Sequence, residues 1–162
     1  MPSVSRTLLA PMLLASATAL AQQPQPPKAA PPYGTPITLA EAKRIAGAAE
    51  AAARRAGALG EVIAIMQPDG SLVYFEKFDR ATYVSIEFAQ AKARTAAITR
   101  MPTGGFGPNS GPPPLPSLIG LPGGLPIVID GRTVGAIGVS GTENVPGWND
   151  VRIAAAGLAA LK

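Results

Sequence analysis

The chain of 162 residues contains neither histidine nor cysteine. Without these side chains the protein has no Ser-His-Asp triad, no Cys-His pair, no zinc site of the usual ligands and no imidazole acid–base catalyst. Disulfide bonds are absent for the same reason, so packing alone has to hold the fold together. Most hydrolase mechanisms are therefore excluded.

The chain also has only a small excess of positive charge, because 14 basic and 10 acidic residues leave a formal net charge of +4. This small surplus is scattered along the chain and does not resemble a surface that follows a phosphate backbone. We therefore expect no nucleic-acid partner. Nearly half of the residues are apolar, 47%, so a chain of this length can form one domain with a real core.

The first 21 residues differ from the rest of the chain. Residues 1–6 carry one positive charge, residues 7–20 are small and apolar, and Ala19-Leu20-Ala21 forms an A-x-A pattern. The apolar run is shorter than the roughly 20 residues that span a bilayer. We predict a secretory signal peptide over residues 1–21, with a retained anchor as the alternative, no membrane span after cleavage, and a periplasmic or secreted mature protein.

A proline-rich segment follows the predicted signal peptide. Residues 22–36 contain six prolines together with glutamine and alanine. Such a composition favours an extended, solvated linker. The folded domain is therefore expected to cover residues 37–162.

The domain begins with a predicted helix. Thr38-Leu39-Ala40-Glu41 is a capping box, in which the threonine hydroxyl accepts a backbone N–H and the glutamate reaches back to the cap. Apolar residues then recur at steps of three and four as far as Ala56, and Gly57 suits a left-handed C-terminal cap.

Two β-hairpins are predicted from turn residues between β-branched runs. Residues 61–67 and 71–77 flank Pro68-Asp69-Gly70, and a second pair of strands flanks Asp130-Gly131, a dipeptide that tolerates a type I′ turn. Gly135 and Gly138 interrupt the last strand, which indicates that another backbone or a flat ligand approaches it closely.

A second predicted helix, residues 83–100, carries two apolar stripes at 100° per residue. One stripe comprises Val84, Phe88, Ala91, Thr95 and Ile98, and the other comprises Ile86, Ala89, Ala93, Ala96 and Ala97. One stripe should pack on the sheet and the other on a further helix or a neighbouring subunit, since an exposed patch of that size favours association. Lys92 and Arg94 lie on the polar strips between them.

The remaining segments are a glycine- and proline-rich stretch and a last helix. Residues 101–124 are expected to hold a short strand near Leu118-Ile119 and otherwise to form a loop that is a candidate lid. Asn149 or Asp150 should cap the last helix, whose packing stripe comprises Ile153, Ala154, Gly157, Leu158 and Leu161.

One ordered set of short motifs runs through the predicted domain: Thr38-Leu39-xx-Ala42, Pro68-Asp69-Gly70, Phe75-xxx-Asp79, Ser85, Lys92-Ala93-x-Thr95-Ala96, Pro122-Gly123-Gly124-x-Pro126, Gly135-xx-Gly138-Val139-Ser140-Gly141 and Ala156-Gly157-Leu158. Taken in this order, the motifs resemble those of the GlcG/HbpS haem-binding family, whose domain is also the C-terminal part of PduO-type proteins. The resemblance implies an α+β single-domain sandwich with an antiparallel sheet of about five strands flanked by helices. It also implies assembly into a homo-oligomer and binding of haem or a related tetrapyrrole.

A tetrapyrrole site needs donors for the propionates and an apolar slot for the macrocycle. Lys92, Arg94 and Arg80 are candidate cations. Bound iron would need Met, Tyr or Lys as a ligand, or would remain five-coordinate or unligated. Met101 and Tyr83 are the candidate ligands, with packing roles as the alternative for both. Met66 is interpreted as a core residue. The predicted cofactor-binding set is Tyr83, Lys92, Arg94, Met101, Gly104, Gly105, Phe106, Gly123 and Gly124.

The resulting expectation is an exported tetrapyrrole-binding protein that acts as a carrier, store or sensor. Two alternatives stay open: a small enzyme or accessory protein of metabolite or cofactor metabolism, and a purely structural oligomer. The enzyme alternative requires a carboxylate pair or a nucleophile with a base. Glu76 with Asp79, or Glu87 alone, is better explained by surface salt bridges.

Overall fold

The computed structural model describes residues 29–106, 111, 115–142 and 145–161. The predicted signal peptide and residues 22–28 of the predicted linker lie outside the described residues. The elements follow one another as α1 (Leu39–Ala56), β1 (Val62–Met66), β2 (Leu72–Lys77), α2 (Tyr83–Thr99), η1 (Thr103–Gly105), β3 (Gly124–Ile129), β4 (Arg132–Ser140), α3 (Asp150–Leu158) and η2 (Ala159–Leu161). No helix among the described residues has the length and apolar character needed to cross a membrane.

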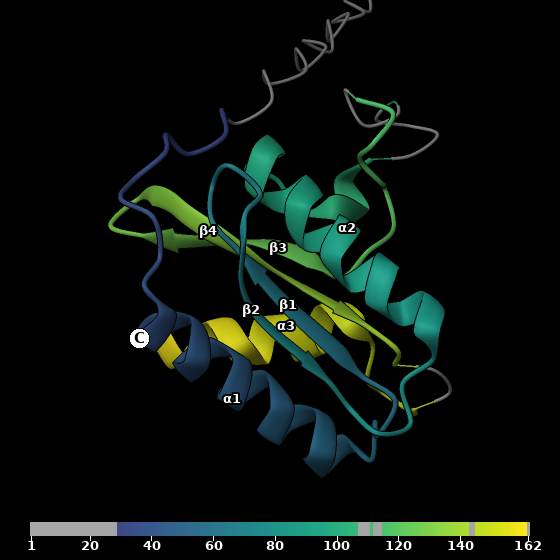
Figure 1. Cartoon of the computed structure of the whole chain (residues 1–162). Coiled ribbons are helices and arrows are strands. Elements are labelled where there is room, and N and C mark those ends of the chain that lie inside the picture. The colour runs from purple at the N-terminus through teal and green to yellow at the C-terminus, as the bar shows by residue number, and fades with distance from the viewer. Residues whose placement is uncertain (1–28, 107–110, 112–114, 143–144, 162) are drawn as a thin grey trace, which may run out of the picture.

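The four strands form one antiparallel sheet in the order β2-β1-β4-β3 (Figure 1). Both predicted hairpins are confirmed, and Asp130 and Gly131 have the positive φ angles, 48° and 71°, that a type I′ turn requires. Helices α1 and α3 cover one face of the sheet and α2 covers the other. The predicted class, α+β, is therefore confirmed.

The sheet has four strands and not the predicted five, because residues 118–119 are not a strand. The N–H of Ile119 donates to the Oγ1 of Thr95 on α2 at 2.9 Å. This part of the glycine- and proline-rich segment therefore lies against a helix and not at a sheet edge. Residues 107–110 and 112–114 of the predicted lid lie outside the described residues.

The helix ends agree with the predicted caps. Thr38 and Glu41 form both bonds of the capping box, and Gly57 is left-handed with φ 78°. Asn149 caps α3 by accepting the N–H of Arg152 at 2.9 Å. Local sequence alone is sufficient to set these ends because each cap involves residues no more than four positions apart.

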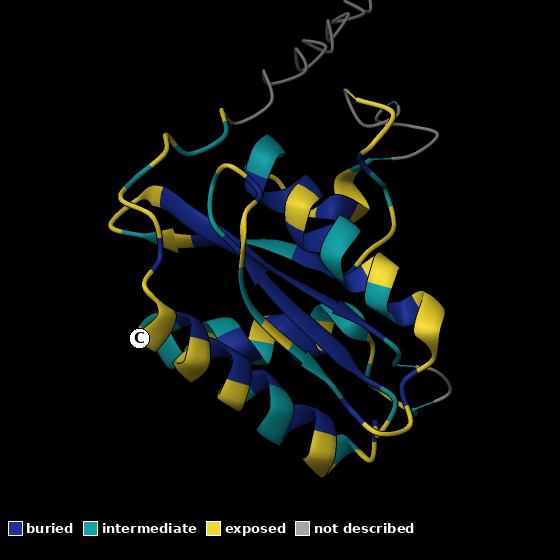
Figure 2. Cartoon of the chain, viewed as in Figure 1, coloured by how far each residue is buried: buried dark blue, intermediate teal, exposed yellow. Residues whose placement is uncertain are grey.

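The two faces of the sheet are filled by different kinds of side chain, and Figure 2 shows the central strands in the colour of buried residues. The face toward α1 and α3 holds fully buried isoleucines: Ile45, Ile63, Ile65, Ile127, Ile137 and Ile153. The face toward α2 holds fully buried alanines: Ala64, Ala89, Ala93, Ala96, Ala97 and Ala136. We call these the isoleucine face and the alanine face.

The alanine face brings the backbone of α2 directly onto β4. A Cβ atom added to Gly138 would lie 2.5 Å from the Ala93 nitrogen and well inside contact with the Ala89 carbonyl oxygen. The close approach predicted at this glycine is thus made by a helix backbone. The other predicted stripe of α2, which comprises Val84, Phe88, Ala91, Thr95 and Ile98, meets Ile119 at Thr95 and is partly exposed, with Val84 at 54%.

The described part of the proline-rich segment, residues 29–36, contacts the domain. Thr133 on β4 donates its N–H to the Pro32 carbonyl and accepts the N–H of Gly34. The Tyr33 hydroxyl donates to the Ile98 carbonyl at 2.6 Å, and the Arg100 guanidinium lies 4.7 Å from the Tyr33 ring centre. These contacts tie the segment to both β4 and the end of α2.

Candidate functional site

Three adjoining pockets form a groove at one end of the sheet, between the start of α2 and the start of α3. The first has a volume of about 240 Å³ and the second, which shares Ser85 and Gly141 with it, about 260 Å³. The third, about 130 Å³, shares Pro122, Thr142 and Asp150 with the second. We call the three together the end groove, and its first pocket the Arg80 pocket.

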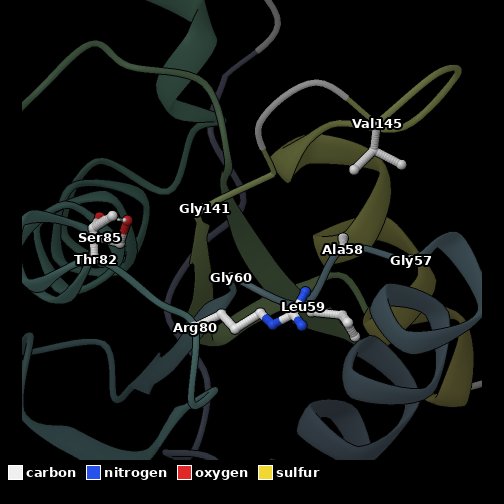
Figure 3. Close-up of a pocket in the computed structure, with 9 residues that line it drawn as sticks. All are labelled: Gly57, Ala58, Leu59, Gly60, Arg80, Thr82, Ser85, Gly141 and Val145. Carbon is white, nitrogen blue, oxygen red and sulfur yellow. Dashed lines mark hydrogen bonds between the residues drawn. The ribbon is translucent and has the colours of Figure 1, made fainter.

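The Arg80 pocket is lined by Gly57, Ala58, Leu59, Gly60, Arg80, Thr82, Ser85, Gly141 and Val145. Figure 3 shows Thr82 and Ser85 on one side of it, Ala58 and Val145 on the other, and the extended Arg80 side chain reaching toward Leu59. Gly141, with φ 127°, touches Gly60 so closely that an added Cβ would meet the Gly60 carbonyl oxygen. Bare backbone therefore forms the floor.

A partly buried ion pair lies at the middle of the end groove. The Lys92 ammonium is 2.5 Å from Asp150 Oδ2 and donates to the Val139 carbonyl at 3.0 Å. Asp150 Oδ1 accepts the N–H of Thr142 at 3.0 Å. The pair thus joins α2, the end of β4 and the first residue of α3.

Glu61 lies under the same end of the sheet and is fully buried. Its Oε1 accepts the Thr142 hydroxyl at 2.5 Å, whereas Oε2 is buried without a hydrogen-bond partner among the described residues. Burial raises the pKa of the Glu61 carboxyl to about 7, and Asp150 adds to this effect against the opposing influence of Thr142 and Lys92. At neutral pH this carboxyl is therefore divided between its neutral and charged forms.

The structure brings three of the predicted site residues together, namely Lys92, Gly123 and Gly124. All three are buried, and a Cβ on Gly124 would meet the Lys92 carbonyl and lie 2.6 Å from Thr103 Cγ2. Lys92 is 3% exposed and its charge is already paired with Asp150. Gly124 accommodates the α2 backbone, and Gly123 accommodates Val139 and the side chain of Asp150. The predicted role of Lys92 as a propionate partner conflicts with its burial.

The other predicted site residues are spread over the surface. Tyr83, 85% exposed, and Met101, 42% exposed, lie at opposite ends of α2, whose 17 residues span about 25 Å. Arg94 lies against the turn at Gly70, since a Cβ there would be 3.1 Å from its guanidinium.

The remaining three predicted site residues belong to η1 and the residue after it. Gly104 is close to Pro122, at the edge of the end groove, and Gly105 has open space beside it. Phe106 contacts Gly120. The structure therefore places Gly104 beside the groove and Phe106 on the neighbouring loop.

Several residues of the end groove were absent from the predicted site. Thr82, Phe88 and Leu121 line it, and Glu61 and Asp150 lie beneath or within it. A single glutamate directly before a fully apolar strand is the sequence signal that could have drawn attention to Glu61. Among the described residues, no three or more Asp and Glu side chains gather where they could hold a metal ion.

Comparison with known proteins gives a family and a fold. The model of the family described as haem degrading protein HbpS-like matches residues 37–159. Protein GlcG of Escherichia coli strain K12 is 37% identical over 83 residues, which cover 48% of this chain and 62% of that protein. The match thus spans about three fifths of the length of this curated relative.

Two solved structures share the architecture. The crystal structure of HbpS is 30% identical, covers 80% of this chain and 92% of that one, and has a TM-score of 0.68. The crystal structure of a complex between PduOC and heme is 22% identical, covers 78% of this chain and 95% of that one, and also has a TM-score of 0.68. At 22% identity, the similarity to the PduOC structure shows a shared fold.

Proposed function

The chain belongs to the HbpS-like haem-degrading protein family, and from this premise we propose that it binds haem or a related tetrapyrrole in the end groove, as an exported carrier, store or sensor. The family and the haem complex of a structural neighbour support the ligand class. The observation that carries the proposal is a groove with exposed apolar side chains in its middle and a cation at one end.

The residues of the end groove suit such a ligand. Val84, Phe88 and Leu121 are 54%, 38% and 46% exposed, so their apolar surfaces are available to a flat macrocycle. Sites for ligands of this size usually have volumes of about 300–1,000 Å³. Each pocket alone is smaller than that, so a ligand of this size would extend over more than one of the three adjoining pockets.

The cation of the site is Arg80 in this proposal and no longer Lys92, whose ammonium is buried against Asp150. A haem bound here would supply its own redox and ligand chemistry. This chain's residues would bind and orient it, with the glycine backbone of the floor leaving room for close approach. Of the two predicted iron ligands, Tyr83 is nearer to the end groove along the chain, because it directly precedes Val84, which lines the groove.

Titration of the purified protein with hemin tests the proposal. A shifted Soret band that saturates at a fixed ratio is expected, and a free-hemin spectrum at every ratio would overturn it. The same titration with iron-free protoporphyrin IX measures how much of the affinity comes from the macrocycle alone. Persistence of the bound spectrum over hours is expected of a carrier, whereas its bleaching would favour the enzyme alternative.

A matched pair of variants locates the site. Phe88 in the groove and Phe75 on β2 are 38% and 37% exposed, so replacing either by serine removes a similar apolar surface. Phe88→Ser should weaken hemin binding at least fivefold, while Phe75→Ser should leave it unchanged. Equal effects of the two substitutions would place the ligand elsewhere.

We further propose export and self-association. The predicted cleavage gives a mature chain that begins at Gln22, and N-terminal sequencing of the protein from the periplasm or medium checks this. The α2 stripe that carries Val84 and Phe88 is partly exposed, which supports a neighbouring subunit that packs beside the bound ligand. A clean monomer in light scattering at micromolar concentration would contradict the self-association.

A further inference from the structure

We propose that the Arg80 pocket is a receptor for a single carboxylate group, supplied either by a propionate arm of the tetrapyrrole or by a free small organic acid. The inference deepens the proposed function and rests on it for the first of these two sources. It depends on a juxtaposition of one guanidinium, two hydroxyls and bare backbone around a cavity of about 240 Å³.

The charge of the lining favours an anion. Of the described residues that line this pocket, Arg80 carries a charge and the others are apolar, glycine or hydroxylic. Glu61 follows Gly60 directly, but its Oε1 accepts the Thr142 hydroxyl and the residue is fully buried. A guanidinium presents a planar fork of N–H donors, and this geometry matches a carboxylate.

The hydrogen bond between the Thr82 and Ser85 hydroxyls uses only one of their two protons. The oxygens of Thr82 and Ser85 are 2.8 Å apart, and one of the two donates in that hydrogen bond. Each hydroxyl has a single proton, so the accepting partner still has a proton of its own to donate. Ser85 is 95% buried, since its exposed fraction is 5%. An acceptor placed in the pocket on the side of Thr82 and Ser85 would satisfy this donor, while the Arg80 guanidinium, which reaches toward Leu59 in Figure 3, supplies the positive charge of the same cavity.

The backbone floor limits the size of the group. Gly60 and Gly141 touch without side chains between them, so the pocket is open to their backbone. A Cβ added to Gly60 would meet the Gly141 and Arg80 carbonyl oxygens at 3.5 and 3.6 Å, which is ordinary contact. Gly60→Ala should therefore fold and narrow the pocket, and this makes it an independent test of occupancy.

Sodium propionate is the probe for the carboxylate itself. Titrated into the ¹⁵N-labelled protein at constant ionic strength, it should shift the amide signals of Gly60, Ser85 and Gly141 saturably. Arg80→Gln should weaken this binding at least fivefold, and Gly60→Ala should weaken it too. Arg55→Gln, which removes the same charge from an exposed site on α1 outside the pocket, should leave it unchanged.

Hemin and hemin dimethyl ester distinguish the two sources. If a propionate arm occupies the pocket, esterification and Arg80→Gln should each weaken hemin binding at least fivefold. The Arg80→Gln variant should then bind the ester no more weakly than it binds hemin. If the ester binds as tightly as hemin while propionate still shifts the three amides, the ligand is a free acid. Failure of hemin to bind at all would overturn the proposed function and leave the propionate result standing. Unsaturable shifts, or equal shifts in wild type and Arg80→Gln, would overturn the carboxylate pocket.

Discussion

The two faces of the sheet solve the same packing problem in opposite ways. On the isoleucine face, large side chains from β1, β3 and β4 keep α1 and α3 away from the strands and fill the space between. On the alanine face, α2 rests with its backbone on β4, because Ala89 and Ala93 meet Gly138. One face is therefore sensitive to lost volume and the other to added volume.

This difference also locates the end groove. At the end of the sheet where β4 finishes, α2 lies close to β4 and α3 begins at Asp150, so elements from both faces line the groove. The paired charges of Lys92 and Asp150 and the buried Glu61 occupy that junction. The predictions below test each face and then the junction between them.

The largest effect is expected from Gly138→Val on the alanine face. A side chain here would displace the α2 backbone, so we expect a loss of more than about 4 kcal/mol in the free energy of unfolding, or no folded protein. Urea denaturation followed by circular dichroism measures it. Gly47→Ala is the control, because an added Cβ meets nothing within 4 Å in the exposed middle of α1; it should stabilise by about 0.5–1 kcal/mol. An unaffected Gly138→Val protein would show that α2 does not lie as close to β4 as described.

The next largest effect is expected from Ile63→Ala on the isoleucine face. The side chain is fully buried, and its truncation leaves a cavity that should cost about 3–4 kcal/mol. Ala64, the next residue, points to the alanine face, and Ala64→Gly should cost only about 1 kcal/mol. Urea midpoints of the two variants give the comparison directly, and equal costs would contradict the contrast between the faces.

A smaller loss is expected from Lys92→Met at the junction. Methionine preserves the length of the stem but leaves Asp150 and the Val139 carbonyl without the ammonium, which should cost about 2–3 kcal/mol. The double variant Lys92→Met, Asp150→Asn should be less destabilised than the sum of the single variants. Additive single effects in this cycle would show that the pair is not coupled.

An effect of similar size concerns the pH dependence that Glu61 confers. Its pKa rises from 4.5 to about 7 on folding, so the folded state favours the neutral acid. The stability from this group is complete below pH 4.5 and is lost as pH rises through 7, by about 2–3 kcal/mol between pH 5 and 8. Glu61→Gln mimics the neutral form, so wild type should lose stability relative to this variant between pH 5 and 8. A constant difference across that range would refute the shifted pKa.

The sequence predicted those features that neighbouring residues set together. The Thr38 capping box, the turn at Asp130-Gly131 and the Asn149 cap depend on backbone angles and hydrogen bonds within a few residues. The glycine pattern in β4 correctly indicated close approach at Gly138. The pattern did not distinguish a helix backbone from a ligand, because a glycine in a strand indicates that something approaches closely but not what approaches.

The site was harder to predict from the sequence than the local features, because the residues that pair with one another in it are far apart along the chain. Lys92 stands between two apolar stripes, where a solvated charge is the normal expectation, and its partner Asp150 is 58 positions away. Glu61 depends on Thr142, 81 positions away. Neither pairing leaves a periodic or local signal that could be recognised before the strands are arranged.

The sequence alone therefore determined the helix ends, the hairpins, the membership of the fold class and the chemistry that lack of histidine and cysteine excludes. Tertiary structure decided which glycines lie against a helix backbone, which lysine is buried and which remote segments line the end groove. The physical reason is distance along the chain. Backbone conformation responds to adjacent residues, whereas burial and ion pairing arise only after the sheet has brought remote segments into contact.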